Sequence, residues 1–230
     1  MKKQTIELLR AWAEEYNDPQ YFEEDPIAFP REFMQRGASP QDIEIAALFA
    51  SFLAWGKRAM IVRDCTRLFD EMEWKPLDYV MAGAYRDDDT SLHRTIKWSE
   101  IAAICSRLRE WFTWHKSLES LSAKEIRSII FRRKDDPKAP DKKINLMRRW
   151  LVRNDGKVDL GLWKNSDPRD LVIPLDVHVY TQANALGLCK RRSKDFGTAL
   201  EITDAFRELF PDDPVKGDFA LFGYGVNSGR

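Results

Sequence analysis

The sequence predicts an all-α protein, and two observations support this prediction. Apolar residues recur at helical spacing along nearly the whole chain, beginning with Ile6, Leu9 and Trp12. Only residues 158–163 and 171–173 have the composition of extended segments, which is too little for a major sheet. The chain has no internal repeat and no low-complexity segment, so a solenoid is not expected.

Helices are expected over most of the chain, with short loops between them. The ranges are 4–16, 40–55, 58–73, 97–115, 123–133, 142–153, 177–186, 197–210 and 215–222. The second of these is apolar on almost every side, so we expect it to be central. Ser39 before Pro40 predicts its N-cap, and Gly56 predicts its end.

The overall charge balance excludes some classes of protein but conceals local asymmetry. The 230 residues suit one large domain or two small lobes, and 37 Lys and Arg cancel 37 Asp and Glu. This excludes a generally basic nucleic-acid coat, an acidic tail protein and a collagen-like chain. Residues 1–50 nevertheless hold five basic and ten acidic side chains, whereas residues 116–157 hold thirteen basic and six acidic ones. Such polarity suits an anionic ligand approached by one face, although a solvated face is the alternative.

Cysteine and histidine are too sparse to indicate a metal or cluster site. The cysteines lie far apart, and no two form a CxxC pair: Cys65, Cys105 and Cys189. The histidines are equally scattered: His93, His115 and His178. We therefore expect free buried thiols, no metal, no iron–sulfur cluster and no cofactor.

Familiar catalytic and targeting signatures are missing from the sequence. It has no GxSxG elbow, P-loop or HExxH motif, and the glycine-rich segment 223–229 lacks the spacing of a dinucleotide site. The N-terminal residues lack the apolar core of a signal peptide. The longest apolar stretch, 45–55, is too short to span a bilayer. We expect a cytoplasmic monomer with no membrane association.

Asp176, in the segment 173–188, is expected to cap a helix that ends at Gly187, with Pro174 fixing the chain before it. Its carboxylate would accept backbone N–H bonds at the positive end of the helix dipole, which favours the charged form. One interpretation is an ordinary helix cap. The other is an anchored anion in a cleft that stabilises a developing cation.

A second segment, 141–153, combines an apolar face with a row of cations. One face carries the apolar side chains Ile144, Met147 and Leu151. Lys142, Arg149 and Arg153 lie on the opposite face of the same helical wheel. A cation at a helix N-terminus is unfavourable. It is tolerated on a solvated surface, and it is useful where a lysine must lose its proton to act as a nucleophile.

Four motifs resemble those of the helix-hairpin-helix DNA glycosylase superfamily, which includes endonuclease III and the 8-oxoguanine glycosylases. They are Arg149-Trp150-Leu151-Val152-Arg153, Asp159-Leu160-Gly161-Leu162-Trp163, Ile173-Pro174-Leu175-Asp176-Val177-His178 and Asp218-Phe219-Ala220-Leu221-Phe222-Gly223. With the helix at 45–58 they span most of the chain. The chain looks most similar to a bacterial family related to the archaeal-type 8-oxoguanine glycosylases.

The resemblance implies a fold and an activity. The fold would be a two-lobed, all-α helix-hairpin-helix arrangement with a cleft between the lobes. The central lobe would cover about residues 58–175, and the N- and C-terminal segments would form the other lobe. The activity would be base excision repair, in which a damaged base of the 8-oxoguanine type is flipped out of double-stranded DNA and removed.

The resemblance also implies roles for individual residues. Asp176 would stabilise the oxocarbenium character of the sugar, and Lys142 would form a Schiff base that opens an AP lyase step. Lys143 is the alternative nucleophile, one residue along the helix. The DNA phosphates would be held by Lys57, Arg58, Arg149, Arg153, Lys190, Arg191 and Arg192. Trp55 and Trp163 would stack on the flipped base, unless they belong to the core.

The sequence departs from the superfamily pattern in two places. The stretch 136–141 has two prolines and no glycine where the superfamily carries a glycine-rich, phosphate-binding hairpin. The iron–sulfur loop of endonuclease III is absent, which favours the oxoguanine branch. Two alternatives stay open: a non-catalytic nucleic-acid-binding module of the same fold, and a helical protein that binds an acidic partner.

Overall fold

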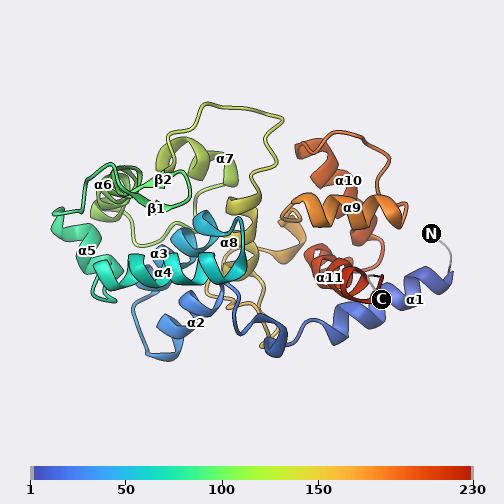
Figure 1. Cartoon of the computed structure of the whole chain (residues 1–230). Coiled ribbons are helices and arrows are strands. Elements are labelled where there is room, and N and C mark those ends of the chain that lie inside the picture. Colours follow the sequence, from blue (N-terminus) through green and yellow to red (C-terminus); the bar gives the residue numbers. More distant parts are fainter. Residues whose placement is uncertain (1–2, 229–230) are drawn as a thin grey trace. The chain divides into compact units, whose positions relative to one another are not determined.

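The computed structural model describes residues 3–228, and helices cover most of that length (Figure 1). The all-α prediction is confirmed. Within the described residues, β-structure is limited to one antiparallel hairpin of β1 (Ser91–His93) and β2 (Ile96–Lys97), which the sequence analysis did not expect. In the same range, no helix is long and apolar enough to cross a bilayer.

The two segments expected to be extended form no strand within the described residues. The first of them, 158–163, lies against the end of helix α8 (Lys142–Val152). The Leu160 N–H donates to the Trp150 carbonyl at 2.7 Å, and the Trp163 N–H donates to the Leu151 carbonyl at 2.8 Å. The segment therefore satisfies carbonyls that the last turn of a helix leaves without partners.

The chain divides into two compact units. The continuous unit is Phe22–Asp135, and the discontinuous unit joins residues 1–21 to residues 136–230. These boundaries differ from the lobe expected at about 58–175. The difference arises from helix packing within each unit. Helix α3 (Pro40–Leu53) packs with α2 (Ala28–Gln35) and α4 (Arg58–Glu71), whereas α9 (Val177–Ala185) and α1 (Lys3–Glu15) both pack against α11 (Gly217–Ser228).

The continuous unit is built around α3 (Pro40–Leu53). Its other helices are α2 (Ala28–Gln35), α4 (Arg58–Glu71), α5 (Pro76–Ala82), α6 (Trp98–Trp114) and α7 (Ala123–Glu125), which continues as a π-helix over Ile126–Ile130. Every residue of α3 from Ile43 to Leu53 is buried, as the all-round apolar pattern predicts. The Ser39 cap is confirmed, because Asp42 N–H donates to its Oγ at 3.1 Å.

The discontinuous unit brings the two ends of the chain together. Its helices are α1 (Lys3–Glu15), α8, α9 (Val177–Ala185), α10 (Phe196–Arg207) and α11 (Gly217–Ser228), with 3₁₀ turns at Pro19–Phe22, Pro168–Asp170 and Pro214–Lys216 nearby. Helix α1, blue in Figure 1, packs along α11, which is red. Leu9 from α1, Ile173, Phe206 and Leu221 share one buried core.

The cysteine prediction is also confirmed. Cys65, Cys105 and Cys189 are buried free thiols. Burial raises the pKa of Cys105 to about 12, so this thiol keeps its proton at neutral pH.

The glycine-rich C-terminal segment is helical and packs against α1. Gly223 faces the ring of Tyr16, and a Cβ at this position would lie 2.4 Å from Tyr16 Cδ2. Gly223 thus allows the backbone of α11 to approach α1 and Tyr16 closely. Gly229 lies outside the described residues.

Replacing Gly223 with alanine is expected to lower the free energy of unfolding by about 1–3 kcal/mol through overpacking. The new Cβ would meet the Tyr16 ring at 2.4 Å and Trp12 Cβ at 2.9 Å. Gly225→Ala is the matched control in the same helix, because its nearest neighbour is the mobile amide of Gln182 at 3.2 Å. Urea denaturation measures both variants, and equal effects would contradict the packing role of Gly223.

Candidate functional site: a lysine–aspartate pair at two helix starts

Lys142 and Asp176 lie side by side although 34 positions separate them in the chain. Lys142 Nζ is 3.6 Å from Asp176 Oδ2, and the two side chains are 29% and 32% exposed. Lys142 is the first residue of α8, and Asp176 is the residue before α9. A solute can therefore reach a positive and a negative group held next to each other.

Asp176 is a helix cap, as the sequence predicted. Its Oδ1 accepts the Val179 N–H at 2.8 Å, and its carbonyl accepts the Tyr180 N–H at 3.0 Å. The helix stops before Gly187, which has a left-handed φ of 72°. Because Oδ1 is bound to the helix, the carboxylate is held in one orientation while Oδ2 faces Lys142.

The start of α8 is fixed by its own backbone. Asp141 has a left-handed φ of 42° and makes no side-chain cap. The buried Asn145 side chain donates to the Pro140 carbonyl at 2.9 Å, which ties the proline-containing stretch to the helix. This arrangement holds Lys142 at a helix N-terminus, where the carboxylate of Asp176 offsets the unfavourable dipole.

Asp218 is a second carboxyl group near the pair, and sequence reasoning gave it no role. It lies in the first turn of α11, is mostly buried, and forms an ion pair with Arg149. Burial raises the pKa of Asp218; Arg149 opposes this shift and the nearby carboxylate of Asp176 adds to it. Its place in one of the four resemblance motifs was the signal that could have singled it out.

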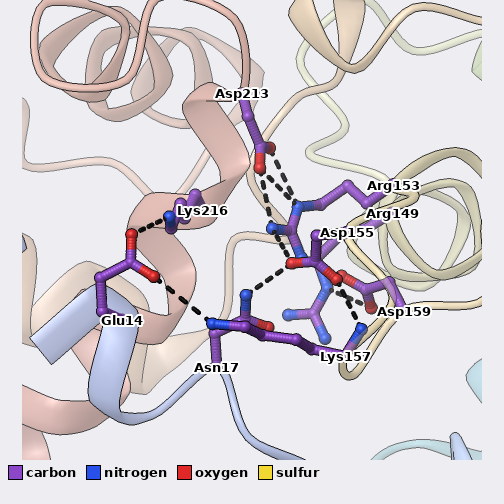
Figure 2. Close-up of polar contacts among 9 residues, drawn as sticks. All are labelled: Glu14, Asn17, Arg149, Arg153, Asp155, Lys157, Asp159, Asp213 and Lys216. Atoms are coloured by element: carbon purple, nitrogen blue, oxygen red, sulfur yellow. Dashed lines mark hydrogen bonds and ion pairs between the residues drawn. The ribbon is translucent and has the colours of Figure 1, made fainter.

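Arg149 and Arg153 do not form the expected phosphate-binding row, and this prediction is wrong. Their side chains are 5% and 1% exposed. Both guanidinium groups contact Asp159, which is itself buried (Figure 2). The helical wheel correctly placed these arginines opposite the apolar face, but other parts of the unit cover that face as well.

Arg153 is the centre of the buried network shown in Figure 2. Its Nε lies 2.9 and 3.0 Å from the two carboxylate oxygens of Asp213, and its Nη2 lies 2.9 Å from Asp155 Oδ2. The Coulombic attraction and these hydrogen bonds offset the cost of burial, so the pKa of Arg153 is raised. The side chain is a structural cation.

The network continues to α1. Asn17 Nδ2 donates to Asp155 Oδ2 at 2.5 Å. Glu14 contacts Lys216 and lies 3.5 Å from Lys157 Nζ (Figure 2). The hydrogen bond from Lys216 lowers the pKa of Glu14. These contacts join α1, the loop after α8 and the start of α11 in one unit.

The second basic cluster stays on the surface of the discontinuous unit. Lys190, Arg191 and Arg192 are all exposed. Arg191 is engaged by Asp195 at 2.9 Å and by Thr198 at 3.2 Å. This cluster is therefore exposed enough to contact phosphates. The carboxylate of Asp195 offsets part of the positive charge of Arg191.

The two tryptophans proposed to stack on a base differ in their exposure to solvent. Trp163 is 3% exposed and belongs to the core, so its stacking role is contradicted. Trp55, in the continuous unit, is partly exposed, but the Arg94 guanidinium lies 4.2 Å from its ring centroid. Lys57 and Arg58, which follow it, are exposed, and Arg58 lies 4.0 Å from Asp25.

A buried aspartate–histidine pair supports the loop that carries Lys57 and Arg58, and sequence reasoning missed it. His93 Nδ1 lies 2.8 Å from Asp64 Oδ2, and its Nε2 lies 2.9 Å from the Trp55 carbonyl. The two ring nitrogens thus link the Asp64 carboxylate to the backbone at Trp55. The two residues are 29 positions apart, and no local pattern indicates their contact.

Comparison with known proteins assigns the chain to a family. The profile described as "Protein of unknown function (DUF2400)" matches residues 25–136 and 123–227. Together the matches cover most of the chain, so the chain belongs to this family. The first match corresponds closely to the continuous unit. Neither the curated proteins nor the solved structures include a match to this chain.

The Arg153→Gln substitution is expected to lower the free energy of unfolding by about 3–5 kcal/mol, because it removes the cation that pairs with the buried Asp159 and with the partly buried Asp155 and Asp213. Arg207→Gln is the control, since Arg207 is 44% exposed and contacts the exposed Asp204 and, at 3.3 Å, the Arg169 carbonyl. Its effect should stay within about 0.5 kcal/mol. Chemical denaturation measures both. Unchanged stability in Arg153→Gln would overturn the structural role.

Asp64 should make the free energy of unfolding depend on pH in the acid range. Burial raises the pKa of Asp64, but hydrogen bonds from Arg63 and His93 outweigh it and hold that pKa below 3.8. The ionised carboxylate therefore contributes stability above about pH 4, and this contribution is lost as the pH falls below that value. Asp64→Asn should be less stable at neutral pH and should lose stability less steeply below pH 4. The exposed Asp87→Asn is the control for denaturation measured across this pH range.

Proposed function

We propose that the protein is a DNA base-excision glycosylase with an associated AP lyase step, acting on an oxidised base of the 8-oxoguanine type. The observation that supports this proposal most directly is the 3.6 Å approach of Lys142 Nζ to Asp176 Oδ2. These are the two residues that the resemblance to the helix-hairpin-helix glycosylases selects. Both are about one-third exposed, so a substrate sugar has access to them.

The arrangement suits cleavage of a glycosidic bond. As the bond between C1′ and the base nitrogen breaks, the sugar acquires positive charge, which the fixed carboxylate of Asp176 stabilises. The departing base takes up a proton. The neutral amine of Lys142 then bonds to C1′, and Asp176 Oδ2 is close enough to accept the proton that the amine must lose.

A covalent Schiff base accounts for the lyase step. Opening of the sugar ring breaks the C1′–O4′ bond, which gives an imine between C1′ and Lys142 Nζ and leaves O4′ protonated as a hydroxyl. Removal of a C2′ proton then expels the 3′ phosphate by β-elimination, and hydrolysis of the imine returns the lysine. No metal or redox partner is needed for this sequence.

Double-stranded DNA would contact the cations that remain exposed. These are Lys57 and Arg58 in the continuous unit and the cluster Lys190, Arg191 and Arg192 in the discontinuous unit. Arg149 and Arg153 are not part of this proposal, because their side chains are buried. Because the net charge is zero, we expect modest DNA affinity that falls as salt is added. We further propose that the protein acts on this DNA as a monomer in the cytoplasm.

Borohydride trapping on DNA that contains an oxidised or abasic nucleotide tests the proposal. The wild-type protein should form a covalent adduct, and Lys142→Ala should abolish it. Lys143→Ala is the matched control and should retain trapping. Loss of trapping in Lys143→Ala alone would reassign the nucleophile to Lys143.

The role of Asp176 needs substitutions that keep the helix cap. Asn and Ser are both good N-caps, so Asp176→Asn and Asp176→Ser should fold with nearly unchanged melting temperature. Both should lower base release by at least about 100-fold, because the charge that stabilises the transition state is gone. Wild-type base release in these variants would reduce Asp176 to a cap. Wild-type protein that binds DNA yet neither traps nor excises any lesion would instead be a non-catalytic nucleic-acid-binding module.

A further inference from the structure

A hollow of about 320 Å³ opens in the continuous unit between the C-terminal part of α6 and the π-helix Ile126–Ile130. Its lining includes Arg107, Trp111 and Trp114 of α6 and the residue that follows the helix, His115. They follow one another at intervals of four, three and one, so they lie along one side of the helix and at its end. None of the lining residues belongs to the unit that carries Lys142 and Asp176.

The hollow has aromatic walls, one of which is exposed. The rings of Trp111 and His115 are stacked, with centroids 3.7 Å apart and planes 13° from parallel. Trp111 Nε1 donates to the Ser117 carbonyl at 3.0 Å, which fixes that ring. Trp114 is 83% exposed, although tryptophan is among the side chains that gain most from burial. An exposed tryptophan beside a hollow is typical of a surface that stacks on a ligand.

The hollow also has a positive lining. Arg107 is half-buried and donates to the Ile130 carbonyl. Arg132 lines the same hollow. Burial lowers the pKa of Arg107, and repulsion from Arg132 lowers it further. Among the described residues, no carboxylate forms an ion pair with either arginine. Glu110 is the one carboxylate in the lining, so positive charge is in excess.

The backbone places Arg132 by unusual means. The helix changes to π geometry over Ile126–Ile130, and Arg132 then adopts a left-handed φ of 46°. Phe131 stacks on Phe52 with centroids 5.2 Å apart, which anchors this turn to α3. Segments of π-helix and non-glycine residues at positive φ are both enriched at functional sites. Here they bring a second guanidinium to the hollow.

We propose that this hollow binds a nucleotide, with the base stacked on Trp114 and the phosphate held by Arg107 and Arg132. A planar aromatic group joined to an anion is the ligand chemistry that matches an exposed indole next to two unpaired guanidinium groups. The volume of about 320 Å³ lies within the usual range for small-molecule sites. Such a nucleotide is either free or part of a single DNA strand. This inference goes beyond the glycosylase proposal, because it concerns the binding of a nucleotide and not the cleavage of a glycosidic bond.

Isothermal titration with undamaged ligands tests this proposal on the full-length protein. The probes are 5′-deoxyadenylate, deoxyadenosine and a single-stranded oligodeoxyadenylate of eight nucleotides. Wild-type protein should bind at least one phosphorylated probe with a Kd below about 1 mM, and deoxyadenosine should bind at least about tenfold more weakly. Trp114→Ala and Arg132→Gln should each weaken binding about tenfold or more. Arg133→Gln, the exposed neighbour outside the lining, is the matched control and should bind as wild type does.

The outcomes separate the two sources of the ligand. Equal affinity for the mononucleotide and the oligonucleotide identifies a free-nucleotide site, and at least tenfold tighter binding of the oligonucleotide identifies a strand. Both substituted side chains are exposed, so unchanged melting temperatures should show that the variants fold. Wild-type affinity in either variant, or no binding of any phosphorylated probe, would overturn the proposal. Because the probes carry no lesion, this result is independent of whether borohydride traps the protein.

Discussion

Arg153 donates hydrogen bonds to carboxylates on three sides from a position almost fully shielded from water. A cation in such a place is stable only while its partners stay in position, because each unpaired charge would cost several kcal/mol. The partners come from the loop after α8 and from the residues before α11. The network therefore fixes the C-terminal end of α8, through Arg149 and Arg153. Lys142 begins that same helix, so the position of its amine depends on the buried ions at the other end.

The Lys142–Asp176 pair depends on a second constraint, which is the meeting of two helix starts. A lysine at the first position of a helix is electrostatically unfavourable, and a carboxylate before a helix is favourable. In their contact, the negative charge of Asp176 offsets the unfavourable position of the Lys142 amine at the start of α8. The carboxylate is held by the helix backbone and not by the lysine alone, so it keeps its orientation when the amine reacts.

Much of the fold could be predicted from local sequence, and the failures have a common physical cause. Ser39 and Asp176 were identified as caps because capping depends on a few neighbouring residues. Arg149 and Arg153 were misplaced because a helical wheel shows which residues share a face and says nothing about what covers that face. Helix α2 was not predicted, and its eight residues include Pro30, which weakens any helical pattern.

In the candidate site, too, some features could be predicted from the sequence and others depend on tertiary packing. Proximity of Lys142 to Asp176 could be proposed from motif order, whereas the place of Asp218 beside Asp176 depends on how α11 packs on α9. The contact of His93 with Asp64 and the hollow beside Trp114 also arise from residues distant in sequence. Such features follow from tertiary structure, and the local sequence around each residue contains no signal for them.

The discontinuous unit sets an order for folding during synthesis. Helix α1 is made first, but the helix that buries it, α11, begins at Gly217. The continuous unit, residues 22–135, is complete long before that point and can fold by contacts within itself. Until α11 leaves the ribosome, the apolar side of α1, with Leu9 and Ala13, lacks the helix against which it packs. The nascent chain thus carries an amphipathic helix with an incompletely covered apolar side, and exposed apolar surface of this kind is what chaperones bind.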